Sequence, residues 1–125
     1  MRLLLDTNVL IRMLEEPHRL GVQVQEALDD ADNDLVVTTV SLVEIAIKVG
    51  TGKLRMPPSI LERLAALDCV ILPVLAEHAM RMARLPVLHR DPFDRLIVAQ
   101  ALAEDLVLVT TDRQLDAYDV VTMRA

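Results

Sequence analysis

Aromatic residues are scarce in this chain of 125 residues, which contains one phenylalanine, one tyrosine and no tryptophan. The 53% of residues that are apolar must therefore build a core from aliphatic side chains and methionine. Such a core suits helices packed on a sheet. The length is close to the commonest size of a single domain, so we expect one domain over residues 1–125.

Cysteine is equally scarce, because Cys69 is the only one. The chain therefore cannot form an internal disulfide or a thiolate metal cluster, and we interpret Cys69 as a small core residue. No apolar run approaches the roughly 20 residues of a membrane span, and Asp6 interrupts the first apolar stretch too early for a signal peptide. We therefore expect a cytoplasmic protein that contacts no membrane.

Positive charge is in deficit, with 13 Lys and Arg against 19 Asp and Glu and a net charge of -6. This balance argues against a broad basic surface for nucleic acid. The objection weakens if the acids gather in one metal-binding pocket, because bound divalent cations reverse the local sign of the field. Any contact with nucleic acid must then be local, from arginines such as Arg81, Arg84, Arg90 and Arg95.

Short apolar runs alternate with helical patterns along the chain. The runs predict buried strands over residues 3–5, 35–40, 70–72 and 106–110, with an edge strand over 120–122. Apolar periodicity predicts helices over residues 20–31, 41–49, 59–67, 76–84 and 93–104. This alternation implies an α/β fold with a mostly parallel sheet and helices on both faces. In such sheets, ligands bind outside the carboxyl ends of the strands.

Two aspartates follow predicted strands directly. Asp6 comes after the first strand, and Asp112 comes after the strand that ends at Thr110. If these strands are neighbours, both carboxylates converge on one crevice at the carboxyl edge of the sheet. The alternative is that each aspartate only forms a turn.

Asp94 shares a helix face with Ile97 and Ala101, its i+3 and i+7 neighbours. A carboxylate beside an apolar face is costly unless it is paired, hydrogen-bonded or bound to a metal. The alternative is that Asp94 only complements the helix dipole near the helix start. Asp91 precedes Pro92 and fits the N-cap position of the same helix.

Glu44 has two interpretations. Residues 41–44, SLVE, match a capping box, and residues 59–62, SILE, match a second one. Glu44 also lies with Lys48 on the only polar edge of an apolar helix, where the two can pair at i, i+4. In that position Glu44 would lie at the lip of a pocket.

Four acids on four segments, without a cysteine or histidine cluster, predict an oxygen-only site that suits Mg²⁺ or Mn²⁺. Hydrolysis of a phosphodiester by metal-activated water fits such a site. The histidines lie outside these segments, and we expect all three on the surface: His18, His78 and His89.

Four motifs stand in this order: LLDTNVL at residues 4–10, SLVEIAIK at 41–48 with GKL at 52–54, HRDPFDRLIVAQA at 89–101, and LVTTD at 108–112. Their order and spacing resemble those of PIN-domain toxins of the VapC type, nearly from end to end. The resemblance implies a three-layer α/β/α sandwich formed by a single PIN domain. It also implies a Mg²⁺-dependent endoribonuclease that an antitoxin holds inactive.

The resemblance also assigns site residues. The family's four acids match Asp6, Glu44, Asp94 and Asp112. Thr7 and Asn8 match positions that support the first acid. Because the third motif offers two aspartates, Asp91 stays a second candidate metal ligand beside Asp94. Arg90 and Arg95, which flank these two aspartates, are candidates for contact with RNA.

Partners are expected as well. The methionines at 13, 56, 80 and 82 and the many aliphatic residues predict apolar surface patches, so we expect a homodimer and a complex with a cognate antitoxin. The alternative function is a catalytically silent PIN-like module that binds RNA or a protein. Metal titration followed by an RNA-cleavage assay separates the two.

Overall fold

The computed structural model describes residues 1–56, 59–88 and 91–125. Its sheet has five strands: β1 (Arg2–Leu5), β2 (Asp34–Thr38), β3 (Val70–Leu72), β4 (Val107–Thr110) and β5 (Thr122–Arg124). They are hydrogen-bonded in the order β3-β2-β1-β4-β5, and every pair is parallel. At the centre, Leu4 lies opposite Val36 on one side and Leu108 on the other.

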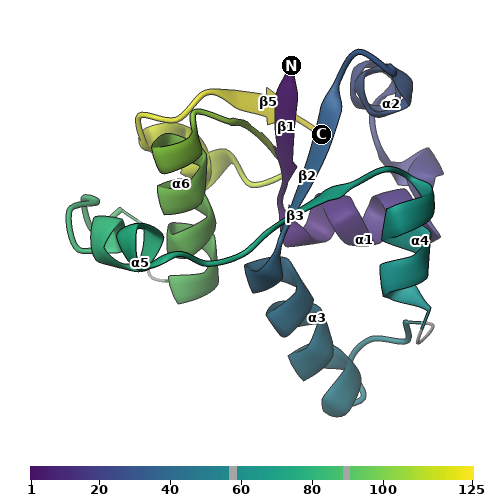
Figure 1. Cartoon of the computed structure of the whole chain (residues 1–125), viewed down its shortest axis with the longest axis horizontal. Helices are drawn as coiled ribbons and strands as arrows, with labels where there is room; N and C mark the ends of the chain where they lie inside the picture. The colour runs from purple at the N-terminus through teal and green to yellow at the C-terminus, as the bar shows by residue number, and fades with distance from the viewer. Residues whose placement is uncertain (57–58, 89–90) are drawn as a thin grey trace.

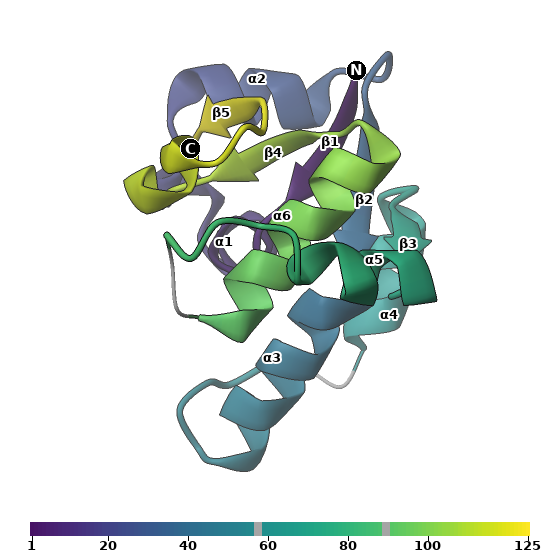
Figure 2. The ribbon, with the colours of Figure 1, turned by 90° about the vertical axis from the view of Figure 1, so that its left-hand side faces the viewer.

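Helices cover both faces of the sheet (Figures 1 and 2). They are α1 (Thr7–Glu15), α2 (Val22–Asp29), α3 (Thr39–Gly50), α4 (Ile60–Ala66), α5 (Ala76–Met82) and α6 (Pro92–Glu104), with 3-10 turns η1 (Pro17–Arg19) and η2 (Arg113–Ala117). In Figure 1, α1, α2 and α4 lie to one side of the sheet and α5 and α6 to the other, while α3 extends beyond the strands. The predicted three-layer α/β/α sandwich is confirmed.

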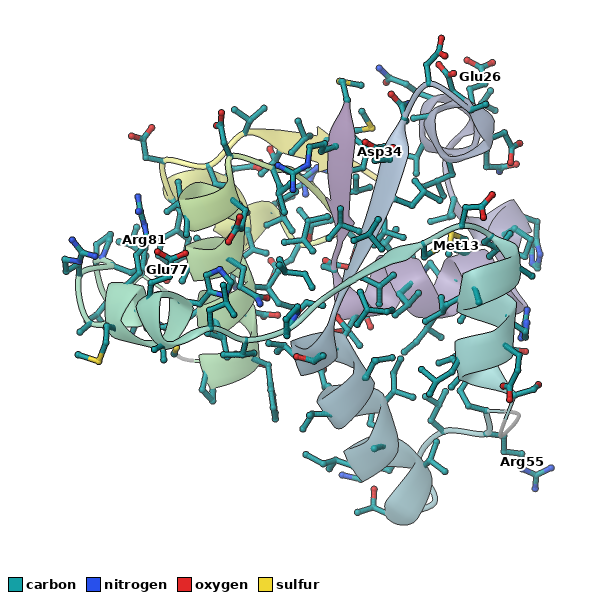
Figure 3. The ribbon with its side chains drawn as sticks, in the orientation of Figure 1. Met13, Glu26, Asp34, Arg55, Glu77 and Arg81 are labelled. Atoms are coloured by element: carbon teal, nitrogen blue, oxygen red, sulfur yellow. The ribbon has the colours of Figure 1, made fainter. Side chains whose placement is uncertain are left out.

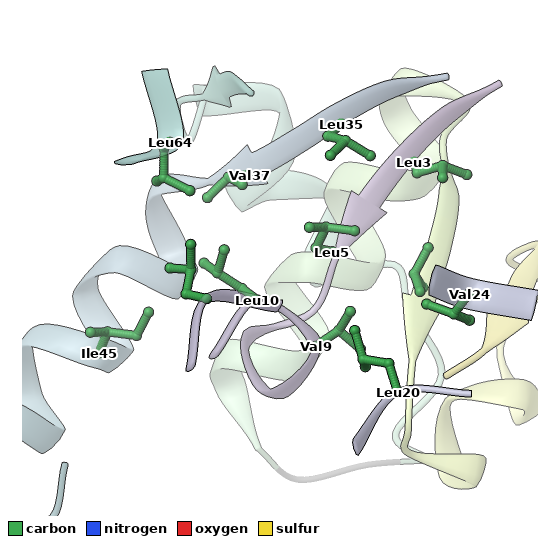
Figure 4. Close-up of a cluster of buried hydrophobic side chains, with 12 residues drawn as sticks. Leu3, Leu5, Val9, Leu10, Leu20, Val24, Leu35, Val37, Ile45 and Leu64 are labelled. Carbon is green, nitrogen blue, oxygen red and sulfur yellow. The ribbon is translucent and has the colours of Figure 1, made fainter. Parts of the chain in front are cut away.

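Two apolar cores hold the layers together, because neighbouring residues of a strand point to opposite faces. Leu3 and Leu5 pack against α1 and α2 in the first core (Figure 4). Leu4 points the other way and packs with Ile97 and Val98 of α6 in the second. All three leucines are fully buried, and burial of each contributes about 1.5–3 kcal/mol.

The sequence patterns missed α1 and misplaced several boundaries; the helix expected over 20–31, for example, spans Val22–Asp29. Asp6 caps α1, and Val9, Leu10 and Leu14 bury its inner face, so capping and periodicity were both present. The strand predicted over 35–40 ends at Thr38, because the Thr38 hydroxyl accepts the Val40 N–H and starts α3. The last strand begins at Thr122 rather than at residue 120.

Neither predicted capping box forms. Ser41 lies buried inside α3, and Ser59 makes no side-chain cap for α4. Asp91 does cap α6, accepting hydrogen bonds from the N–H groups of Phe93 at 2.8 Å and Asp94 at 3.4 Å. The Asp91 cap is therefore confirmed.

The histidine expectation was partly wrong. His18 is exposed, but His78 is fully buried between α5 and α6, while His89 lies outside the described residues. Cys69 packs, partly buried, against the first core as expected. Within the described ranges, no helix has the length and apolar character needed to cross a membrane.

Candidate functional site

Asp6 lies at the carboxyl edge of the sheet, between two strands. Its backbone N–H donates to the Val109 carbonyl at 3.0 Å, so β1 and β4 are paired up to this residue. Its carboxylate accepts the Val9 N–H at 2.9 Å, which caps α1, and the Thr110 hydroxyl on its other oxygen. The side chain is held from three directions, with only 5% of the residue exposed.

Burial raises the pKa of Asp6 above its ordinary value of 3.8. Hydrogen bonds from Thr110 and from the backbone of Val9 and Thr111 oppose this rise, and the nearby charge of Asp112 adds to it. An ionised carboxylate in this position lacks a compensating cation from the described residues around it. The site therefore favours binding of a positive charge beside Asp6.

Asp112 follows the neighbouring strand β4, as the sequence predicted. Its backbone N–H donates to the Thr110 hydroxyl at 3.0 Å, and its carboxylate accepts the Gln114 N–H at 2.9 Å to cap η2. Asp112 therefore forms the turn of the alternative interpretation, and its charge is near enough to Asp6 to raise the pKa of that carboxyl. Thr110 touches both Asp6 and Asp112 and fixes their relative position.

Glu44 joins the same edge through Thr7. The Thr7 hydroxyl lies 2.8 Å from a Glu44 carboxylate oxygen and 2.9 Å from the Ser41 hydroxyl. An ionised carboxylate only accepts, so Thr7 donates to Glu44 and accepts from Ser41. Lys48 lies 3.4 Å from the second Glu44 oxygen, the i, i+4 pair that the helix pattern allowed. Glu44 is half-buried, at the lip between α1 and α3.

Asp94 lies half-buried in the first turn of α6. Its position relative to the strand ends depends on how α6 packs on the sheet. The Thr38 hydroxyl donates to the Gln100 side-chain carbonyl at 2.5 Å, where β2 ends. Asp94 is six residues before Gln100 on α6, and Glu44 is six residues after Thr38 on α3. Each residue therefore lies about 9 Å from that contact along the axis of its own helix.

The remaining predicted residues have different surroundings. Asn8 is exposed on the first turn of α1, beside Asp6 in the chain. Arg95 donates from Nη2 to the carbonyls of Met82 at 2.9 Å and Leu85 at 3.3 Å, so this guanidinium braces the chain after α5. Arg90 lies outside the described residues.

A second group of donor atoms lies between α5 and α6. Glu77, His78 and Glu104 offer ligand atoms within 4.8 Å of one another. The Leu75 N–H donates to His78 Nδ1 at 3.0 Å, so the ring proton is on Nε2, which donates to Glu104 at 2.8 Å. Nδ1 thus caps the start of α5 and Nε2 links α5 to α6, so both ring nitrogens are engaged and we interpret this group as structural.

Three supporting residues were missed from the sequence: Ser41, Thr110 and Gln100. The sequence pattern predicted Ser41 as a helix cap. Because Ser41 lies one turn before Glu44, the same pattern also placed the two side chains on one face of the helix. Thr110 ends a buried strand two residues before Asp112, which was a usable signal. The Thr38–Gln100 contact spans 62 positions of sequence and left no local signal.

The donor set of this edge consists of carboxylate oxygens with hydroxyl support, a chemistry that fits Mg²⁺ or Mn²⁺ and not a thiolate-preferring metal. Asp6, Asp112 and Glu44 are connected through Thr110 and Thr7. Asp94 lies in the first turn of α6, in the other layer, with Asp91 as the cap of the same helix. The arrangement can hold a hard cation against a negatively charged substrate.

The sequence matches the PIN domain family over residues 3–121. Ribonuclease VapC22 of Mycobacterium tuberculosis is 29% identical over 126 residues, which cover 92% of this chain and 90% of that protein. A crystal structure of VapBC2 from Rickettsia felis, bound to a DNA fragment from their promoter, contains a chain with TM-score 0.74 and 18% identity, covering 99% of this chain and 98% of that one. VapBC-5 of M. tuberculosis, from the VapBC family of toxin-antitoxin systems, gives TM-score 0.62 and 28% identity, with coverage of 99% and 98%.

Proposed function

The chain belongs to the PIN-domain family, and on that premise we propose that it is a metal-dependent endoribonuclease, the toxin of a toxin–antitoxin pair. The observation that carries the proposal is the connected set of Asp6, Glu44 and Asp112 at the carboxyl edge of the sheet. The similarity to ribonuclease VapC22 supports RNA as the substrate. Hydrolysis of an internal phosphodiester bond is the reaction.

The residues that hold the cation in this proposal are Asp6, Glu44, Asp94 and Asp112, with Asp91 as the other aspartate near the start of α6. The cofactor is Mg²⁺, or Mn²⁺ in its place, because the donors are all carboxylate oxygens. When bound, such a cation lowers the pKa of a water molecule and stabilises the charge on the leaving oxygen. The hydroxyl groups described at this edge are engaged in hydrogen bonds with the carboxylates and with one another, which leaves water as the nucleophile.

The protein's own contribution is positioning. Thr110 fixes Asp6 against Asp112, and Thr7 orients the Glu44 carboxylate. Burial of Asp6 removes water from one side of the site, which strengthens its attraction for a cation. Asn8, exposed next to this pair, is in place to contact substrate or water.

The proposed protein partner is an antitoxin. Between α3 and α4 lies a hollow of about 480 Å³ with a mostly apolar lining: Leu42, Ile45, Ala46, Val49, Gly50, Met56, Ile60 and Leu61. Leu61 is 58% exposed and Val49 is 41% exposed, so this hollow is an apolar surface of the kind that a partner helix covers. The solved relatives described as toxin-antitoxin systems support such a partner.

The proposed homodimer uses other apolar surface. Val43 and Ile47 on α3 are 51% and 50% exposed, and Val70 on the edge strand β3 is 54% exposed. An edge strand with apolar side chains is a natural site of association. Sedimentation of Val43→Glu beside the wild-type chain tests the dimer, which this substitution should dissociate.

Incubation of the purified protein with RNA, in EDTA and then with added Mg²⁺, tests the nuclease function. We expect no cleavage in EDTA and cleavage with Mg²⁺. Tight RNA or protein binding without cleavage at any metal concentration would instead favour the catalytically silent module.

A further inference from the structure

A hollow of about 410 Å³ lies between the end of α5 with the chain that follows it, α6, and the end of η2. This volume falls within the roughly 300–1,000 Å³ of small-molecule sites. Its wall combines apolar side chains with three charged ones: Arg81, Arg84, Leu85, Pro86, Leu102, Ala117, Tyr118 and Asp119. The carboxylate edge described above contributes none of these residues.

Arg81 and Arg84 give this hollow its positive charge. Arg81 lies in the last turn of α5, and the Arg84 N–H donates to the Arg81 carbonyl at 3.0 Å, so a turn brings the second arginine close to the first. Neither guanidinium has a hydrogen bond or ion pair with any residue that the structure describes. In a chain with net charge -6, the wall of this hollow carries two positive charges, Arg81 and Arg84, and one negative charge, Asp119.

The hollow is built on fixed elements. Arg95 of α6 holds the Met82 and Leu85 carbonyls, which ties the segment carrying Arg84 to the helix behind it. Leu85 and Tyr118 are buried in the second core and form part of the wall. A site whose walls are already in place loses less entropy on binding.

We propose that this hollow is a second RNA subsite, in which Arg81 and Arg84 bind a backbone phosphate of the substrate RNA outside the carboxylate edge. The apolar wall, including Pro86 and Leu102, packs against the sugar or base. Asp119 accepts a hydrogen bond from a ribose hydroxyl or a base amino group. The subsite rests on the proposed ribonuclease function.

The mixture of charges favours a nucleotide over an acidic peptide. Asp119 repels the negative charge of either ligand, but a nucleotide also brings hydroxyl and amino groups that can donate hydrogen bonds to Asp119, whereas the acidic side chains of a peptide cannot. Guanidiniums match phosphate oxygens in geometry and bind them bidentately. The apolar wall is likewise suited to the uncharged part of a nucleotide.

The test uses Arg81→Ala/Arg84→Ala, with Lys53→Ala/Arg55→Ala as the control. The control also removes two positive charges, and Figure 3 shows Arg55 and Arg81 at opposite ends of the molecule. Binding of a fluorescent oligoribonucleotide is measured in EDTA over a range of salt concentrations. Cleavage with Mg²⁺ is then measured on a long oligoribonucleotide and on a short one that reaches only the carboxylate edge.

We expect Arg81→Ala/Arg84→Ala to bind the oligoribonucleotide more weakly than the control does. At 0.1 M salt the loss of affinity is about fivefold for each phosphate that the variant no longer holds. The slope of log affinity against log salt concentration should be smaller by about 0.7 for each such phosphate. KM for the long substrate should rise with little change in kcat, and the short substrate should be cut as by the wild-type chain. Equal binding, salt slope and KM in both double variants would overturn the subsite. Loss of binding to the antitoxin with RNA binding intact would overturn it in favour of a protein partner.

These outcomes separate the two proposals. If the wild-type chain cuts RNA and both variants match it, the nuclease function stands and the subsite fails. If neither the wild-type chain nor any variant cuts RNA but Arg81→Ala/Arg84→Ala alone loses oligonucleotide binding, the nuclease function fails, and the hollow binds RNA without being a subsite of a cleavage reaction.

Discussion

Thr7 donates its hydroxyl proton to the Glu44 carboxylate, 2.8 Å away, and thereby links the start of α1 to the middle of α3. This contact joins residues that are 37 positions apart in the chain. Because Thr7 follows Asp6 directly, a single short segment supplies one acid and orients another. A residue that orients a ligand affects metal affinity without binding the metal itself.

Thr7→Val should therefore weaken metal binding, because the isosteric side chain cannot donate to Glu44. We expect the Mg²⁺ concentration for half-maximal cleavage to rise by about 10- to 100-fold, while the rate at saturating metal changes less. Thr7→Ser keeps the hydroxyl and should restore most of the affinity. A Thr7→Val protein with the wild-type Mg²⁺ dependence would show that Thr7 only fills space.

Asp6 makes the stability of the metal-free protein depend on pH. Burial raises its pKa in the folded protein above 3.8, so folding favours the protonated form. This contribution to stability is complete below about pH 3.8 and is lost as the pH rises through the raised pKa. In EDTA at neutral pH, Asp6→Asn should therefore raise the melting temperature, and the gain should shrink toward acid pH.

Asp34→Asn is the matched control for that measurement, because Asp34 is an exposed aspartate at the opposite end of the neighbouring strand (Figure 3). It should not reproduce the pH-dependent gain. If Asp6→Asn lowers the melting temperature at every pH, the burial of Asp6 is not the dominant effect.

The two aspartates near the start of α6 should behave differently. Asp91 accepts hydrogen bonds from Phe93 and Asp94 as the N-cap, and asparagine caps a helix almost as well. Asp91→Asn should therefore keep stability and most activity. Asp94→Asn should lose most cleavage and stay folded. Melting curves and cleavage rates of both variants, with and without Mg²⁺, check this, and an inactive Asp91→Asn beside an active Asp94→Asn would reverse the assignment.

The Thr38–Gln100 hydrogen bond should contribute to stability as well as to geometry, because both side chains are fully buried. Gln100→Leu leaves the Thr38 hydroxyl without its acceptor. We expect a loss of about 1–3 kcal/mol in the free energy of unfolding. Urea unfolding measures it, and a loss below that range would mean that Thr38 finds another acceptor.

The sequence predicted the layers and the strand-end acids because these depend on local signals. Leu3 to Leu5 form an uninterrupted apolar run, and Asp6 ends it, so strand and site appear together in four residues. The capping box at Ser41 was wrong because Ser41 lies inside α3, where its hydroxyl forms a buried hydrogen bond with Thr7. Ser59 makes no side-chain cap either. Pairs such as Thr38 and Gln100 could not be predicted, because only the folded packing of α6 on the sheet brings them together.

The most direct test of the metal-dependent carboxylate site measures the rate of oligoribonucleotide cleavage. Mg²⁺ is titrated into EDTA-treated protein, and the wild-type chain is compared with Glu44→Gln and Glu62→Gln. Glu62 is an exposed glutamate on α4 and serves as the control. The wild-type chain and Glu62→Gln should be inactive in EDTA and reach the same saturating rate. Glu44→Gln should lose more than the roughly 10- to 100-fold that a supporting residue costs. Full activity without metal, or a Glu44→Gln curve that overlays the Glu62→Gln curve, would contradict the account.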